Sequence, residues 1–245
     1  MKFQEKTAMV TGAAAGIGRA VALCLAQQGA DLVLLDIDIE KLQKVGEAAG
    51  QHGSKVLTYA CDISNQQQVD DTVADAIKQL GKIDILINNA ALFRDTTLFA
   101  QSSADLWKRY LDVNVMGVYY CTRAVIGGML ENHYGRIVNV ASVAGVYGNL
   151  YMVHYSATKG AVISMTKALA KEVTDKGVLV NCVSPGTVTP SQYEDMDAFV
   201  PNDMSFIGRS GTNRENANLI LFLASDDATY ISGQNIQIDG CRKKL

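Results

Sequence analysis

The sequence predicts an α/β fold, a doubly wound parallel sheet of about seven strands with helices on both faces, in a single domain over residues 1–245. Short apolar runs alternate with longer amphipathic stretches along nearly the whole chain. The strands are apolar on both sides of the pleat, and the stretches between them are long enough for a crossover helix. The expected strands are Thr7–Thr11, Asp31–Asp36, Lys55–Ala60, Ile83–Asn88, Arg136–Val140, Leu179–Val183 and Asn235–Ile238.

Helix signals fall between these strands. Two capping-box patterns, Ser64-x-x-Gln67 and Thr212-x-x-Glu215, predict helix starts. Apolar periodicity predicts one long helix from about Ala104 to Leu130 and another over Val153–Val173.

Composition excludes several classes of protein. With 245 residues, 48% hydrophobic, the chain buries a full core. The net charge of −3, and no basic cluster longer than Arg242-Lys243-Lys244, argue against a nucleic-acid partner. The N-terminus is charged, and no apolar run approaches the ~18 residues of a membrane span, so we expect a cytoplasmic protein without membrane attachment.

The cysteines and histidines predict no metal site. The five cysteines are odd in number, widely spaced and without a C-x-x-C pair, which favours reduced and mostly buried thiols. The three histidines have no ligand spacing either.

A glycine-rich loop, Thr11-Gly12-Ala13-Ala14-Ala15-Gly16-Ile17-Gly18, follows the first strand and opens a helix that runs to about Gln28. Such a loop lets the backbone N–H groups at a helix N-terminus approach a pyrophosphate. In this strand–turn–helix context, the loop predicts a Rossmann-type dinucleotide site that includes Gly12, Gly16, Ile17 and Gly18.

Asp36 ends the second strand, 18 residues after Gly18. Its carboxylate is positioned to accept hydrogen bonds from the adenosine ribose hydroxyls and to repel a 2′-phosphate. No basic residue stands at Ala15 or Ile37, so NAD is favoured over NADP. A structural alternative is that Asp36 caps the helix that starts at Ile39.

Tyr155 and Lys159 lie four residues apart on the expected Val153–Val173 helix, so they share one face about a turn apart. Alone, such a pair is more often a surface contact. Together with a dinucleotide site, it is a candidate acid–base centre.

These motifs resemble the short-chain dehydrogenase/reductase family over essentially the full chain, because the T-G-x-x-x-G-x-G spacing is the family's own form. Cys61-Asp62-Ile63 resembles the segment whose aspartate contacts the adenine ring. Asn88-Asn89-Ala90-Ala91 resembles the N-N-A-G segment, with Ala91 in place of glycine. The resemblance therefore implies cofactor contacts from Asp62, Ile63, Asn89, Ala90 and Ala91.

The resemblance also implies a catalytic set. Ser142 lies 13 residues before Tyr155 and matches the family's active-site serine, which orients the substrate oxygen. Tyr155 matches the general acid/base, and Lys159 matches its partner, which also binds the nicotinamide ribose. Asn114 matches the asparagine that helps hold a water connected to the lysine.

Pro185-Gly186-Thr187-Val188 resembles the turn that packs against the nicotinamide. Relatives carry a threonine for the carboxamide where this chain has Pro190, so Thr189 or Thr187 is expected to take that role. We expect cofactor contacts from Pro185, Gly186, Val188 and Thr189.

The sequence thus predicts an NAD-dependent oxidoreductase that interconverts a secondary alcohol and a ketone. One alternative is a 3-oxoacyl-carrier-protein reductase, and another is a non-catalytic NAD-binding regulatory protein. The resemblance implies a homotetramer or homodimer. Substrate choice is expected from loops Leu92–Thr97, Val143–His154 and Val188–Ser210. The last is acidic, which favours a neutral alcohol, and is expected to form a lid.

Overall fold

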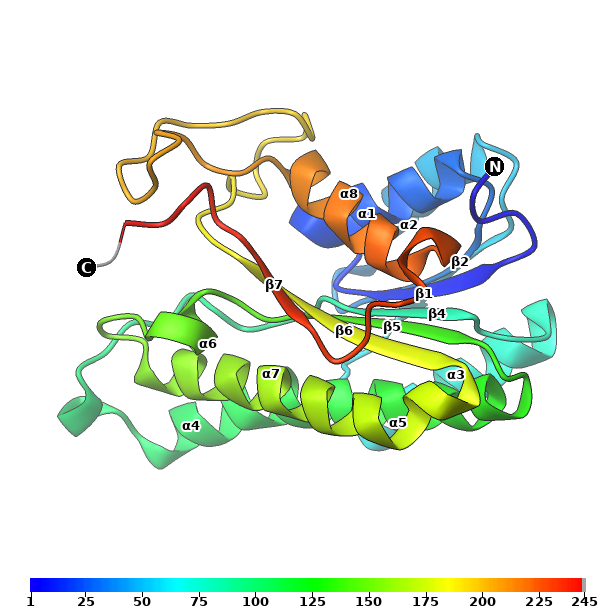
Figure 1. Cartoon of the computed structure of the whole chain (residues 1–245), viewed down its shortest axis with the longest axis horizontal. Coiled ribbons are helices and arrows are strands. Elements are labelled where there is room, and N and C mark those ends of the chain that lie inside the picture. Colours follow the sequence, from blue (N-terminus) through cyan, green and yellow to red (C-terminus); the bar gives the residue numbers. More distant parts are fainter. Residues whose placement is uncertain (244–245) are drawn as a thin grey trace.

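The computed structural model describes residues 1–243 as a seven-stranded parallel sheet between two layers of helices (Figure 1). Lys244, the last residue of the basic run, lies outside the described residues. The strands are β1 (Thr7–Thr11), β2 (Asp31–Asp36), β3 (Val56–Ala60), β4 (Ile85–Asn88), β5 (Gly135–Val140), β6 (Val178–Pro185) and β7 (Asn235–Ile238). The α-helices are α1 (Gly16–Gln27), α2 (Ile39–Gly50), α3 (Gln66–Leu80), α4 (Ala104–Leu111), α5 (Gly117–Glu131), α6 (Ala144–Tyr147), α7 (Val153–Val173) and α8 (Asn213–Ala224).

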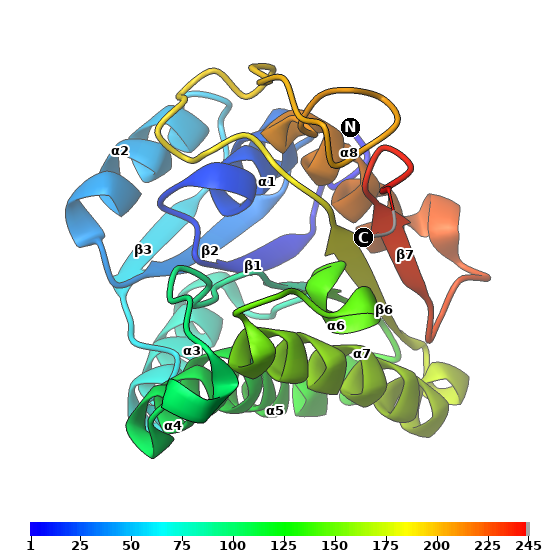
Figure 2. The ribbon, with the colours of Figure 1, turned by 90° about the vertical axis from the view of Figure 1, so that its left-hand side faces the viewer.

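The strand order is β3-β2-β1-β4-β5-β6-β7, with every neighbouring pair parallel. The chain winds outward in one direction from β1 and in the other from β4. The order therefore reverses between β1 and β4, and ligands of such sheets bind at this reversal, beyond the carboxyl ends of the strands. Figure 2 looks onto that edge of the sheet.

Each face of the sheet has its own apolar core. Helices α1, α2 and α8 cover one face, and α3, α4, α5 and α7 cover the other (Figure 1). The first core joins Val10, Leu34 and Ile87 to α1 and α8, whereas the second joins Met9 and Leu86 to helices of the opposite layer. Alternate residues of one strand thus face opposite cores, which explains why these strands are apolar on both sides.

Two predicted strand starts were early, for the same physical reason. The N–H of Lys55 donates to the carboxylate of Asp31 at 2.8 Å, and the N–H of Thr7 donates to the carboxylate of Asp84 at 2.9 Å. Aspartate side chains thus replace backbone acceptors where β3 and β4 were expected to begin. Strands β5 and β6 each begin one residue earlier than predicted, because Gly135 pairs with Val178. Strand β6 also ends later than predicted, because Ser184 and Pro185 continue to pair with β7.

Of the two predicted capping boxes, the structure confirms one and corrects the other. The capping box at Thr212 and Glu215 is formed in full. The predicted box at Ser64 was wrong: Asn65 caps α3 by accepting from the N–H of Gln68, while the Ser64 hydroxyl donates to Asp62.

The long helix expected over Ala104–Leu130 is not a regular α-helix. A π-helical turn over Asp112–Met116 separates α4 from α5 and contains the buried Asn114. Such turns are rare and often lie at functional sites.

Candidate active site

The predicted site residues gather at the carboxyl edge of the sheet. The loops after β1, β4, β5 and β6 lie together at this edge in Figure 2, with the N-terminus of α1 on one side and α6 and α7 on the other. The 188–210 segment runs across the top of this view. It contains no helix or strand, apart from isolated bridges such as Pro201 to Arg209.

The glycine-rich loop turns sharply at Gly12. This residue has a φ of +65°, and a Cβ there would lie 2.8 Å from the Cα of Ala90, so only glycine fits this position. Helix α1 then begins after Ala15, which has no side chain to cap it, and its first turn holds no acidic residue. The first helical N–H bond comes from Arg19 to the carbonyl of Ala15 at 3.2 Å. Within residues 1–243, the N–H groups of Gly16, Ile17 and Gly18 have no hydrogen-bond acceptor, so they could donate to an anion.

Asp36 lies beside this loop rather than at a helix start. One carboxylate oxygen accepts from the N–H of Ala14 at 3.0 Å, and the other accepts from the N–H of Asp38 at 3.0 Å. Asp38, not Asp36, caps α2 by accepting from Lys41. The capping alternative for Asp36 is therefore wrong, and its half-buried carboxylate borders the loop that was predicted to bind a dinucleotide.

Asp62 and Ile63 follow β3. The Asp62 carboxylate accepts from both the N–H and the hydroxyl of Ser64, at 2.9 and 2.7 Å. Ile63 is buried, and a Cβ on Gly117 would lie 2.5 Å from its Cδ1. Ile63 thus packs directly on the start of α5, while the exposed Asp62 stays at the edge.

The segment after β4 is tied to the glycine-rich loop. The hydroxyl of Thr11 accepts from the N–H groups of Asn89 and Ala90 at 3.0 and 3.1 Å, and the Asn89 amide donates to the carbonyls of Thr11 and Gly12. Ala91 has no left-handed backbone, so its extra methyl introduces no backbone strain.

The catalytic candidates converge from two elements. Ser142 follows β5, while Tyr155 and Lys159 lie in α7. A Cβ on Gly145 would lie 2.6 Å from the backbone carbon of Lys159, so this glycine lets the serine loop lie against α7. The Lys159 ammonium is 5.8 Å from the centroid of the Tyr155 ring and donates to the carbonyl of Val140 at 2.7 Å.

The electrostatics of these groups follow from burial. Burial raises the pKa of Tyr155, and a hydrogen bond with Ser142 opposes that rise. Burial also lowers the pKa of Lys159 to about 8, against a smaller opposite effect of Cys182. The fully buried ammonium has one hydrogen-bond partner among residues 1–243, which leaves donors for further groups.

Asn114 in the π-helical turn fixes the loop after β4. Its side-chain oxygen Oδ1 accepts from the N–H of Leu92 at 2.8 Å. Its side-chain Nδ2 donates to the backbone carbonyl of Leu92 and to the hydroxyl of Thr158. The side chain of Asn114 thus joins this loop to α7, one residue before Lys159. No sequence pattern predicted the contact between Asn114 and Thr158.

The end of β6 and the residues that follow it contact different parts of the chain. Pro185, the last residue of β6, pairs with β7, and the N–H of Gly186 donates to the carbonyl of Ile238. Val188 bridges to Gly211. The buried Thr189 hydroxyl bonds to Ser210 and to the carbonyl of Ala198, both at 2.8 Å. These bonds of Thr189 join separate parts of the 188–210 segment to one another, whereas Thr187 is exposed.

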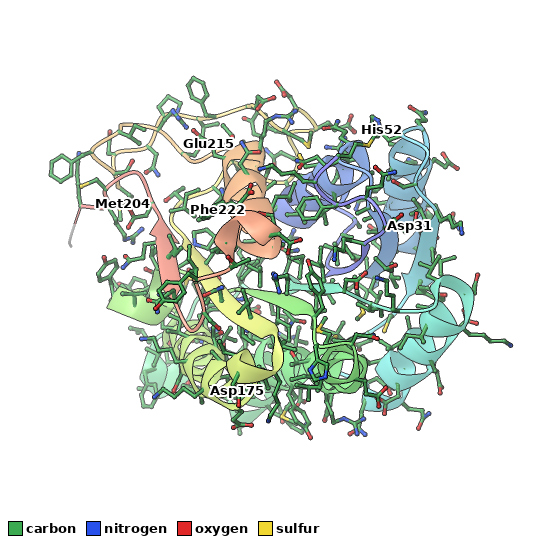
Figure 3. The ribbon with its side chains drawn as sticks, turned by 45° about the vertical axis from the view of Figure 1, so that its right-hand side comes forward. Asp31, His52, Asp175, Met204, Glu215 and Phe222 are labelled. Atoms are coloured by element: carbon green, nitrogen blue, oxygen red, sulfur yellow. The ribbon has the colours of Figure 1, made fainter. Side chains whose placement is uncertain are left out.

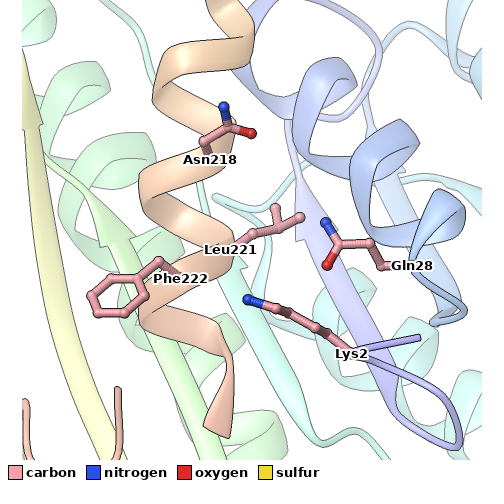
Figure 4. Close-up of a pocket in the computed structure, with 5 residues that line it drawn as sticks. All are labelled: Lys2, Gln28, Asn218, Leu221 and Phe222. Atoms are coloured by element: carbon pink, nitrogen blue, oxygen red, sulfur yellow. The ribbon is translucent and has the colours of Figure 1, made fainter. Parts of the chain in front are cut away.

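Other features lie away from this site. The recess in Figure 4, of about 170 Å³, is lined by Lys2, Gln28, Asn218, Leu221 and Phe222, near the C-terminal ends of α1 and α8. Within residues 1–243, no three His, Cys, Asp or Glu side chains are grouped to hold a metal ion. Over the same range, no helix has the length and apolar character needed to cross a membrane.

Comparisons with known proteins identify the family of this chain. A family model described as enoyl-(acyl carrier protein) reductase matches residues 12–241. The chain belongs to the short-chain dehydrogenase/reductase family. As a member of this family it is an oxidoreductase, and the sequence prediction of the family and the fold is confirmed.

Individual members differ in their substrates. A 3-oxoacyl-[acyl-carrier-protein] reductase of Thermotoga maritima is 40% identical, and the alignment covers 98% of both chains. A (2S)-[(R)-hydroxy(phenyl)methyl]succinyl-CoA dehydrogenase subunit of Thauera aromatica is 39% identical, over 99% of this chain and 98% of the relative. The structure of a NAD⁺-bound xylitol dehydrogenase superposes with a TM-score of 0.90 at 32% identity, over 98% of this chain and all of the other.

Proposed function

We propose that this protein is an NAD-dependent oxidoreductase that interconverts a secondary alcohol and a ketone. The observation that carries this proposal is the convergence of Ser142, Tyr155 and Lys159 opposite an uncapped helix N-terminus. The loops after β4 and β6 lie at the same edge of the sheet. A homotetramer or homodimer in the cytoplasm is part of the same proposal and rests on family resemblance.

The residues present fit a nicotinamide cofactor. The free N–H groups of Gly16, Ile17 and Gly18 would bind the pyrophosphate, and Asp36 would accept from the ribose hydroxyls. Lys159 would bind the nicotinamide ribose with the N–H donors that Val140 leaves free. When bound, the cofactor supplies or accepts the hydride. Asp62, Ile63, Asn89, Ala90 and Ala91 are proposed to border the adenine and ribose, and Pro185, Gly186 and Val188 the nicotinamide.

The protein's own residues move the proton. In ketone reduction, the Tyr155 hydroxyl donates its proton to the oxygen that becomes the alcohol. In alcohol oxidation, the phenolate must accept that proton, and forming a phenolate at pH 7 costs roughly 4 kcal/mol from a reference pKa of 10. Burial raises this cost, and the Lys159 cation lowers it. Ser142 donates a hydrogen bond that orients the substrate oxygen.

Asn114 is proposed to support a water linked to Lys159. Its side-chain amide already binds Leu92 and Thr158. Because a π-helical turn disrupts the regular i to i−4 bonding, we assign the water contact to its backbone carbonyl rather than to its side chain.

The substrate is proposed to have a neutral, largely apolar body. Exposed large apolar side chains occur in all three of the loops Leu92–Thr97, Val143–His154 and Val188–Ser210, which is typical of a binding surface. These side chains are Phe93, Val146, Tyr147, Leu150, Tyr151, Val153, Tyr193, Phe199, Phe206 and Ile207. The acidic character of the 188–210 segment adds little support, because Asp197 is paired with Arg214.

Replacement of Tyr155 tests the proposal. Tyr155→Phe should abolish turnover in a screen of cyclic alcohols, polyols and their ketones, while NADH binding, followed by its fluorescence, changes less than about threefold. Tyr119→Phe, at an exposed tyrosine of α5, should retain full activity. Turnover retained in Tyr155→Phe would sink the assignment. Tight NADH binding without turnover in the unaltered protein would instead favour a regulatory role.

A 3-oxoacyl-carrier-protein reductase is the second candidate, favoured by the 40% identity to the Thermotoga maritima enzyme. Asp36 argues for NAD in this chain, because its carboxylate borders the site where a 2′-phosphate would lie. We expect Asp36→Ala to weaken NADH binding and to reduce the ratio of NADH affinity to NADPH affinity. An unchanged preference would remove Asp36 from the ribose site, and faster turnover of a 3-oxoacyl thioester with NADPH would favour the second candidate.

A further inference from the structure

The 188–210 segment is fixed across the N-terminus of α1 by an ion pair. The guanidinium Nε of Arg214, in the first turn of α8, donates to both carboxylate oxygens of Asp197 at 2.7 and 2.8 Å. The backbone N–H of Arg214 donates to the carbonyl of Met196 at 3.0 Å. One residue of α8 thus holds both the side chain and the backbone of this stretch.

A second arginine holds the same stretch from α1. Arg19 follows Gly18 in the first turn of α1, and its Nη1 donates to the carbonyl of Glu194 at 2.8 Å. The stretch 191–197 is therefore attached to both α1 and α8, close to the N-terminus of each helix.

Ser191 lies directly over the start of α1. A Cβ placed on Gly16 would be 3.6 Å from the Cβ of Ser191 and 3.8 Å from the side-chain oxygen of Asn213. That oxygen of Asn213 is buried and has no hydrogen-bond partner within residues 1–243. The stretch thus lies beside Gly16 at the start of α1, where the proposed function places the cofactor pyrophosphate.

We propose that Arg214 and Asp197 form a latch that keeps the 191–197 stretch closed over the pyrophosphate, so that Arg214 is a positioning residue for cofactor retention. This inference rests on the proposed nicotinamide site. A cofactor at the start of α1 would have to pass Ser191 to leave, and opening the latch would uncover that path. Arg19 contributes a single bond to a backbone carbonyl and is the weaker attachment.

The geometry separates this role from a contribution to folding. The side chains of Arg214 and Asp197 are 35% and 57% exposed, and ion pairs of such exposure contribute little to the free energy of unfolding. The contact instead fixes the orientation of the Asp197 carboxylate, because both of its oxygens accept from the single Nε–H of Arg214. Its loss should therefore change the release of a ligand much more than the melting temperature.

The test measures NADH dissociation by stopped-flow displacement with excess NAD. Arg214→Gln and Asp197→Asn should each raise the dissociation rate about tenfold, and the double variant should be no faster than either single one, because both changes remove one interaction. Arg214→Lys should recover part of the slow release. Melting temperatures should stay within about 2 °C of the unaltered protein.

Asp70→Asn is the matched control. It breaks another two-oxygen contact to a single arginine, between α3 and Arg123 of α5, in the opposite helix layer. This variant should release NADH at the unaltered rate. Unchanged release in the Arg214 and Asp197 variants, or additive effects in the double variant, would overturn the latch while leaving the proposed function intact. Failure of the unaltered protein to bind NADH would overturn both.

Discussion

The N-termini of α1 and α8 lie on the same side of the sheet and at the same edge, yet they are built in opposite ways (Figures 1 and 2). At α8 the hydroxyl of Thr212 accepts from the N–H of Glu215 at 3.0 Å, and the Glu215 carboxylate accepts from the N–H of Thr212 at 2.8 Å. At α1 the corresponding cap position is Ala15, which has no acceptor side chain. Figure 3 shows Glu215 at the start of α8, with Phe222 further along the helix.

The difference teaches how one helix start is left for a ligand while its neighbour is closed by the protein itself. Each helix N-terminus has free N–H donors and a partial positive charge. Side chains satisfy these donors at α2, α3 and α4 as well, through Asp38, Asn65 and Ser103. Without a capping side chain at Ala15, the free energy of unfolding is lower by about 1 kcal/mol. An anion bound to the free N–H groups would compensate for this loss.

The largest expected effect comes from closing the α1 N-terminus. Ala15→Asp places a carboxylate where the pyrophosphate would bind. Two such charges about 4 Å apart repel by about 4 kcal/mol at an effective dielectric of 20. We therefore expect NADH affinity, measured by fluorescence titration, to fall on the order of 1,000-fold, while the ligand-free protein melts at the same or a higher temperature.

The neutral variant Ala15→Asn is the control for this change. It also caps the helix but adds no charge, so it should weaken NADH binding less than Ala15→Asp. Equal NADH affinity in Ala15→Asp and the unaltered protein would mean that the start of α1 is not an anion site.

Removal of the cap at the α8 N-terminus should lower the free energy of unfolding without changing NADH affinity. Thr212→Ala leaves the N–H of Glu215 without its acceptor and should cost about 1 kcal/mol, or about 2–4 °C in melting temperature. NADH affinity should stay within about twofold. Thr212→Ser should retain most of the stability, and a stronger loss of NADH binding than of stability would contradict the division of roles between the two helices.

The smallest effect should appear in the pH dependence of stability. The guanidinium of Arg209 and the N–H of Thr212 hold the pKa of Glu215 down at about 2, below its ordinary 4.5. This lowered pKa stabilises the fold fully above pH 4.5, and the contribution is lost as the pH falls through about 2. Because the side chain is 41% exposed, we expect roughly 0.5 kcal/mol.

Glu215→Gln tests this by urea unfolding at several pH values. The variant should be slightly less stable at pH 7 and should approach the unaltered protein as the pH is lowered from 4.5 towards 2. A difference that grows towards low pH would have the wrong sign and would assign the stabilisation to another group.

Local patterns predicted the fold well where a single interaction dominates. Helix α7 and the strands β1, β2 and β7 have the predicted bounds, because their apolar periodicity matches the surface that they bury. Two of the errors, the early starts of β3 and β4, occurred where an aspartate side chain replaces a backbone acceptor. Asp31 and Asp84 shorten two strands in this way.

The sequence by itself determined the family and the fold class, because motifs at fixed spacing and the alternation of apolar strands with helices carry that information. Only the tertiary structure decided which groups remain free. Thr189, expected at the nicotinamide, bonds to Ser210, and Asn114 uses its amide on Leu92 and Thr158. Hydrogen bonds between residues far apart in sequence depend on packing, so no local pattern reveals them.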